Sequence, residues 1–216
     1  MNYIENVYIC LAAPMLVALI CMQSSRKRLI LFLLIGMTCC LLSSYVSTFL
    51  TLVSGETPEL AAIEIVPMVE ETVKLLPILF YLMVFEPEKE IATTAAVLIG
   101  IGFATFENVC YLTQSGAQDI FRLMIRGFGT GAMHVICGVI AGTGVLYMWD
   151  RFWLRAVGTV GLWVMSVVYH AVYNLLVSQT GLPAWAGYLI PLITTMMILI
   201  YGKKIYNRGL QRFREE

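Results

Sequence analysis

The sequence predicts an all-α membrane protein, a polytopic helical bundle of about seven transmembrane helices. Hydrophobic residues make up 59% of the 216 residues and charged residues only 13%, with a mean hydropathy of +0.81. An ordinary soluble domain carries about 25% charged residues. The apolar runs are roughly 17 to 25 residues long, which is enough to cross the hydrocarbon core of a bilayer as helices. We therefore expect residues 1–216 to form a single transmembrane domain.

Seven spans follow one another along the chain with short loops between them. The first has no basic residue before it and no small-residue cleavage site after it, so we interpret it as an uncleaved anchor. The third is interrupted by four ionisable residues and by two prolines, which are able to kink a helix. The expected spans are residues 5–22, 29–53, 61–85, 91–113, 123–148, 156–177 and 184–202.

The basic residues predict the orientation, because cytoplasmic loops of membrane proteins carry an excess of Lys and Arg. With the N-terminus outside, 11 of the 14 basic residues lie in inside segments, whereas Arg122 and Arg126 lie near the outer face and Lys74 lies within a span. We expect the N-terminus outside and a basic cytoplasmic tail at residues 203–216. The inside residues are Arg26, Lys27, Arg28, Lys89, Arg151, Arg155, Lys203, Lys204, Arg208, Arg212 and Arg214.

Charge and cysteine content narrow the function classes. The net charge is zero and the pI is about 6.7, so nothing favours a nucleic acid as partner, and the lipid bilayer is the expected environment. No two cysteines have the CxxC spacing of a metal or redox motif. We interpret all six as buried packing residues: Cys10, Cys21, Cys39, Cys40, Cys110 and Cys137.

Ionisable side chains inside the middle spans are the main functional signal. A charged side chain at bilayer depth costs at least ~2.5 kcal/mol, so it needs a partner or a water-filled cavity and marks a functional site. Four successive spans carry such groups to a similar level, which predicts one shared cavity in the outer half of the membrane. The expected depths below the outer boundary, at 1.5 Å per residue, are ~14 Å for Glu70, ~9 Å for Glu107, ~17 Å for His134 and ~11 Å for His170.

Spacing within each helix supports this cavity, because residues four apart share a helix face. Glu71 points about 100° away from Glu70, so only one of the two faces the centre squarely and the other holds a neighbouring helix or the lysine. Gly138 and Asn174 offer space and an amide, respectively, beside the two histidines. The pairs on one face are Glu70 with Lys74, Phe103 with Glu107, His134 with Gly138, and His170 with Asn174.

Four segments resemble, in order, the motifs EExxK, FxxxEN, HxxxG and HxxxN of the PrsW family of intramembrane proteases. They are PMVEETVKLLPILF at 67–80, GIGFATFENVCYL at 100–112, MHVICGVIAG at 133–142 and YHAVYNLL at 169–176. The motifs are also similar in kind to EExxxR, FxxxH and HxxxN of the CAAX-processing and bacteriocin-processing membrane proteases. The departures are Lys for Arg with one residue less of spacing, and Glu107 in place of a histidine.

The resemblance implies an intramembrane endopeptidase with a catalytic core at about residues 61–177. It implies site-1 cleavage of a single-span membrane protein, an anti-sigma factor, at the outer side of a bacterial cell membrane. It does not indicate an oligomeric state.

The residues themselves also suit a hydrolase without a Ser, Thr or Cys nucleophile, which needs a base, an oxyanion stabiliser and an acid. We expect Glu70 to activate water, with Glu71 and Lys74 tuning it. The two histidines and Asn174 would polarise the carbonyl, and Glu107 would orient a histidine or share the water. The candidate catalytic residues are Glu70, Glu71, Lys74, Glu107, His134, His170 and Asn174.

A metal site is left open beside this hypothesis. Two histidines and a glutamate also form the open zinc site of many hydrolases, so Zn²⁺ or another divalent ion could be held by Glu107, His134 and His170. The HExxH motif is absent, and the two histidines are 36 residues apart on different helices.

Two other function classes compete with the protease. Intramembrane Glu and His residues also mark ion pathways, as in a proton-coupled transporter or channel, but such proteins tend to have related halves, and the motifs do not repeat between the halves of this chain. A non-catalytic membrane scaffold is the other alternative. Alanine at Glu70 or His170 distinguishes the three classes. A protease would lose cleavage but still bind its substrate, a transporter would lose flux, and a scaffold would tolerate the change.

Overall fold

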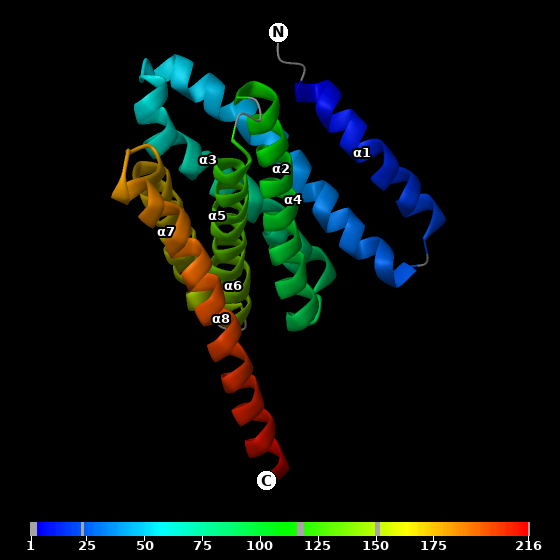
Figure 1. Ribbon diagram of the computed structural model, residues 1–216. Coiled ribbons are helices and arrows are strands. Elements are labelled where there is room, and N and C mark those ends of the chain that lie inside the picture. Colours follow the sequence, from blue (N-terminus) through cyan, green and yellow to red (C-terminus); the bar gives the residue numbers. More distant parts are fainter. Residues whose placement is uncertain (1–3, 23, 116–118, 150–151, 216) are drawn as a thin grey trace.

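The chain folds into helices that run back and forth between the two ends of one bundle (Figure 1). The computed structural model describes residues 4–22, 24–115, 119–149 and 152–215. Within these ranges the regular elements are all helical, which confirms the all-α prediction. They are α1 (Ile4–Cys21), α2 (Ser24–Ser54), α3 (Pro58–Phe85), α4 (Lys89–Ser115), α5 (Ile120–Gly138), the π-helix η1 (Val139–Thr143), α6 (Gly144–Met148), α7 (Phe152–Val177) and α8 (Leu182–Glu215).

The seven expected spans each correspond to one helical rod, because α5, η1 and α6 follow one another without a break. Six rods in the described ranges are long and apolar enough to cross a membrane. The exception is α3, whose apolar stretch is interrupted by three charged residues, Glu70, Glu71 and Lys74. Its 28 residues nevertheless extend about 42 Å at 1.5 Å per residue, more than the thickness of a hydrocarbon core.

The two described chain ends lie at opposite ends of the bundle (Figure 1). An odd number of rods requires this, but which end faces the cytoplasm stays a prediction. Some of the basic residues used for that prediction lie outside the described part: Arg151, and the side chains of Arg26, Lys203, Lys204, Arg208, Arg212 and Arg214.

Local sequence signals mark the starts of helices α3 and α5. Thr57 precedes α3 and accepts a hydrogen bond from the Leu60 backbone N–H, and Pro58 occupies the first helical position. Asp119 precedes α5 and accepts from the backbone N–H groups of Phe121 and Arg122. The two N-cap side chains satisfy N–H groups that the helix itself leaves unpaired. Pro58, at the start of α3, has no N–H group to satisfy.

Helix α4 lies at the centre and approaches its neighbours without intervening side chains. A Cβ atom at Gly102 would lie 2.1 Å from the Leu33 carbonyl oxygen on α2, and one at Gly100 would lie 2.7 Å from the His134 carbonyl oxygen on α5. Small residues permit such backbone contacts between membrane helices. The two close contacts hold α2, α4 and α5 at short distance, and with them the side chains of Glu107 and His134.

Gly138 and the residues after it also serve this packing. We expected Gly138 to leave room beside His134, but a Cβ atom there would meet the Ala96 carbonyl oxygen of α4 at 2.8 Å, so the neighbouring backbone uses the space. The π-helical turn Val139–Thr143 follows at once. Such turns occur mostly as single bulges in α-helices and often near functional sites.

Helix α1 packs on the edge of the bundle against α2 and α4. Ala12 is the one residue of Ile4–Cys21 that is buried. Cys10 and Cys21 are exposed and Cys110 of α4 is only half-buried, so the prediction that all cysteines are buried is wrong for these three. Cys39, Cys40 and Cys137, on more central helices, are buried as expected.

Candidate active site

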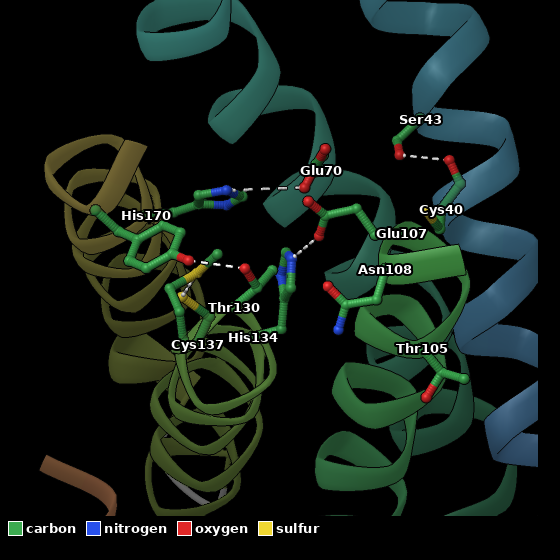
Figure 2. A network of polar contacts seen from close by, with 12 residues as sticks. Cys40, Ser43, Glu70, Thr105, Glu107, Asn108, Thr130, His134, Cys137 and His170 are labelled. Carbon is green, nitrogen blue, oxygen red and sulfur yellow. Dashed lines mark hydrogen bonds and ion pairs between the residues drawn. The ribbon is translucent and has the colours of Figure 1, made fainter. Parts of the chain in front are cut away.

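Four helices bring the intramembrane polar side chains into one cluster (Figure 2). The cluster is largely shielded: His134 is 0% exposed, His170 3%, and Glu71 and Lys74 4% each. Its members are Glu70, Glu71 and Lys74 of α3, Glu107 of α4, His134 of α5 and His170 of α7.

An ion pair within α3 forms the back of the cluster. Lys74 Nζ lies 2.6 Å from Glu71 Oε1. The same two groups reach the histidines, because Lys74 Nζ is 2.8 Å from His134 Nδ1 and Glu71 Oε1 is 2.8 Å from His170 Nδ1. We expected the glutamate that does not face the centre to hold a neighbouring helix or Lys74. The structure pairs Lys74 with Glu71, since residues three apart also meet on a helix.

These contacts assign different hydrogen-bonding states to the two histidines. An ammonium group only donates, so His134 Nδ1 accepts from Lys74, and its Nε2–H donates to Glu107 Oε2 at 2.6 Å. A carboxylate only accepts, so His170 Nδ1–H donates to Glu71 and the Nε2 lone pair stays open. Metal-binding histidines commonly bond a carboxylate in this way through their second nitrogen. His170 therefore has the form of a ligand, whereas His134 is engaged at both nitrogens.

Glu70 is the carboxylate with an unused oxygen. Its Oε2 atom is buried, has no hydrogen-bond partner among the described residues, and lies 3.8 Å from His170 Nε2. A buried polar atom without a partner is costly, and more so when it is charged. This oxygen therefore requires a water molecule or a cation.

A divalent cation fits the residues present. Glu70, His134 and His170 each offer a ligand atom, and the three atoms lie within 4.8 Å of one another. Two imidazole nitrogens and one carboxylate oxygen are the protein ligands of many open zinc sites. His134 would exchange one of its present partners for the ion. The expected ligand set contained Glu107, but in the structure Glu70 belongs to the group and Glu107 bonds to His134.

Glu107 is held from the other side by Arg126 of α5, a residue to which the motifs gave no role in the site. One guanidinium nitrogen lies 3.4 Å from Glu107 Oε1 and another 2.7 Å from Asn108 Oδ1. The guanidinium also stacks on Tyr111, 3.6 Å from the ring centroid. The only sequence signal for Arg126 is that it is one of two basic residues near the outer face. Its partners lie on another helix, so spacing could not identify them.

A cavity of about 220 Å³ opens onto the cluster. Glu70, Glu107 and Arg126 line it, and so does Ile4 at the start of α1. The cavity thus lies toward the end of the bundle at which the chain begins. It gives water access to two carboxylates and a guanidinium, whereas Glu71 and Lys74 do not line it.

Asn174 has a different place from the one expected. Its Nδ2 atom donates to the Ala62 carbonyl oxygen at 2.8 Å and thereby ties α7 to α3, one helical turn from His170. Within the described part of the chain, its hydrogen bond goes to this backbone and not to the cluster. The structure supports a positioning role for Asn174 and not a direct action on a carbonyl.

Comparison with known proteins adds one finding. The family model of the PrsW family intramembrane metalloproteases matches residues 24–201, which confirms the resemblance drawn from the four motifs. No curated protein and no solved structure gives a significant match.

Proposed function

Since the chain belongs to the PrsW family of intramembrane metalloproteases and is therefore a multi-pass membrane peptidase, we propose that the cluster hydrolyses a peptide bond of a single-span membrane protein. The observation that carries this proposal is the group Glu70, His134 and His170, with ligand atoms within 4.8 Å of one another beside a cavity that water can enter. The transporter and scaffold alternatives lose their basis with the family match.

Glu70, His134 and His170 would hold a divalent ion, for which zinc suits the donor set. When bound, such an ion activates water and polarises a carbonyl group. Because Glu70 belongs to this group, we assign the base to Glu107, which lines the same cavity. Glu107 takes a proton from the attacking water and returns it to the leaving amine.

The remaining members of the cluster position these groups. Arg126 binds one oxygen of Glu107 and Asn108 beside it, which limits the rotation of the carboxylate. Glu71 holds His170 through Nδ1, and Lys74 holds His134 through Nδ1. Neither Glu71 nor Lys74 is placed in contact with the reacting peptide.

We assign the substrate to the class that the four motifs imply, an anti-sigma factor cut at the outer side of a bacterial cell membrane. The position of the cavity supports cleavage on the outer side. Ile4 lines it, and the distribution of Lys and Arg predicts that the start of the chain lies outside. An extended segment next to the substrate's membrane span could reach the cavity from that side.

Co-expression with candidate single-span regulators tests the proposal. Glu107→Gln should lower cleavage by about 10²–10⁴-fold, the usual contribution of a general base. Glu70→Gln and His170→Gln should also abolish cleavage and should lower the zinc content of the purified protein, measured by mass spectrometry. Glu64→Gln is the matched control, because Glu64 is an exposed glutamate on the same helix. Cleavage by Glu107→Gln at the wild-type rate, or full zinc content in both ligand variants, would contradict the assignment.

A further inference from the structure

A second cavity, which we call the outer cavity, lies next to the cavity of the active site. Its volume is about 450 Å³, and its walls come from the end of α4, the start of α5, the α7–α8 turn and the start of α8. Its lining includes Tyr111, Phe121, Arg122, Gln179, Trp185 and Tyr188. Tyr111 lines both cavities. The two cavities therefore meet at one side chain, on which the guanidinium of Arg126 stacks.

The sizes of the two cavities suggest different tasks. Binding sites for small ligands usually measure about 300–1,000 Å³. The active-site cavity, at about 220 Å³, has room for little more than the reacting peptide unit. A polypeptide must therefore be held by further surface close by, and the outer cavity, at about 450 Å³, lies within the usual range.

The lining of the outer cavity suits a peptide. Phe121 and Trp185 form an exposed aromatic pair with ring centroids 6.3 Å apart, and the two side chains are 62% and 47% exposed. Aromatic walls take up large apolar or aromatic side chains. Arg122 and Gln179 line the same cavity and can bond the carbonyl groups of an extended backbone. A lipid acyl chain would use the aromatic rings but not these polar groups.

We propose that the outer cavity is a specificity subsite, which binds a large apolar or aromatic side chain of the substrate a few residues away from the cleaved bond. The chain of the substrate passes Tyr111 between the two cavities. This proposal rests on the proposed peptidase function and adds the recognition of one side-chain class.

Filling the outer cavity tests the proposal. Ala184 lines it, so Ala184→Phe reduces its volume, whereas Ala186→Phe, two residues along the same helix, makes the same change at a position outside its lining. The probes are internally quenched peptides in detergent micelles, built on one cleaved parent sequence, with alanine or tryptophan scanned through each position. The wild type should prefer tryptophan at one position by about 10-fold or more in kcat/KM, the range that apolar pockets reach.

Ala184→Phe should lose this preference mainly through KM, while Ala186→Phe keeps it. An unchanged preference in Ala184→Phe, or equal loss in both variants, would overturn the subsite. So would a loss of co-purifying phospholipid in Ala184→Phe without a change in preference, because the cavity would then be a lipid site. If Ala184→Phe does not fold, Trp185→Ala removes one wall and should lower the same preference.

The result also separates this proposal from the proposed function. A wild-type protein that cleaves peptides without any side-chain preference at a fixed distance from the cut leaves the peptidase intact and overturns the subsite. A wild-type protein that cleaves neither the peptides nor co-expressed single-span proteins overturns the peptidase assignment, and the subsite with it.

Discussion

Replacing Lys74 by methionine should destabilise the protein strongly. Lys74 is 4% exposed, and its ammonium group lies 2.6 Å from Glu71 and 2.8 Å from His134. Attraction over 2.6 Å amounts to ~6 kcal/mol at an effective dielectric constant of ~20, and the loss of hydration of the two ions largely offsets it. Methionine removes the attraction but leaves the carboxylate of Glu71 buried.

We expect Lys74→Met to lower the free energy of unfolding by about 3 kcal/mol, the lower end of the range for a broken buried ion pair. The lower end applies because His170 still donates to Glu71. A much smaller loss would be expected if Lys74 made only an ordinary polar contact. Polar contacts between membrane helices contribute on average only ~0.6 kcal/mol, because the unfolded chain in the membrane also finds partners. The larger loss applies here, because the variant leaves the charged carboxylate of Glu71 buried without its cation.

Reversible unfolding of the purified protein in mixed micelles measures this loss. The double variant Glu71→Gln/Lys74→Met should regain most of it, because no ion is left unpaired. Lys27→Met serves as the matched control, because Lys27 lies near the start of α2 and is only partly buried, and it should change the stability by less than ~0.5 kcal/mol. A loss below ~1 kcal/mol, or a double variant no more stable than the single one, would refute the reasoning.

Three further predictions concern helix packing and the site. Gly102→Val should lower the melting temperature sharply, because the added Cβ would lie 2.1 Å from the Leu33 carbonyl oxygen. Gly161→Val is the control, since a Cβ there has no neighbour within 4 Å. Equal melting temperatures of the two variants would count against the α2–α4 contact. Asp119→Ala should cost about 1 kcal/mol in thermal unfolding through the lost N-cap, and a change below ~0.3 kcal/mol would speak against this cap. Asn174→Ala should lower the stability but keep the zinc content of the wild type, because Asn174 ties α7 to α3. Loss of zinc would contradict this purely positioning role.

Much of the fold follows from the sequence because lipid imposes one simple requirement on each span. An apolar run of sufficient length must be helical, and the expected spans agree with the rods to within a few residues at most ends. The third rod starts earlier than the expected residue 61, at Pro58, because Thr57 caps it. The π-helical turn after Gly138 was not foreseen, since the identity of residues 139–143 does not distinguish a π-turn from an α-turn.

The cluster could be anticipated more easily than its internal contacts. Depth and face depend only on the rise and rotation per residue, so the meeting of His134 and His170 with the glutamates follows from their positions. Which glutamate pairs with Lys74 depends on side-chain rotamers and on the helices behind them, so spacing left both Glu70 and Glu71 open, and the structure has Glu71. The contacts of Arg126 depend on how α4 packs against α5, and no sequence pattern within a single helix predicts that packing.

The contact between α2 and α4 at Gly102 has a consequence for how the enzyme accommodates different substrates. Two backbones that touch cannot separate or slide without losing that fit, so these helices act as one rigid frame behind the catalytic carboxylates. Any widening of the entrance must then come from its edge, the first helix, of which Ala12 alone is buried and whose Ile4 lines the cavity. Selection for new cleavage targets would act on that edge before it could alter the frame.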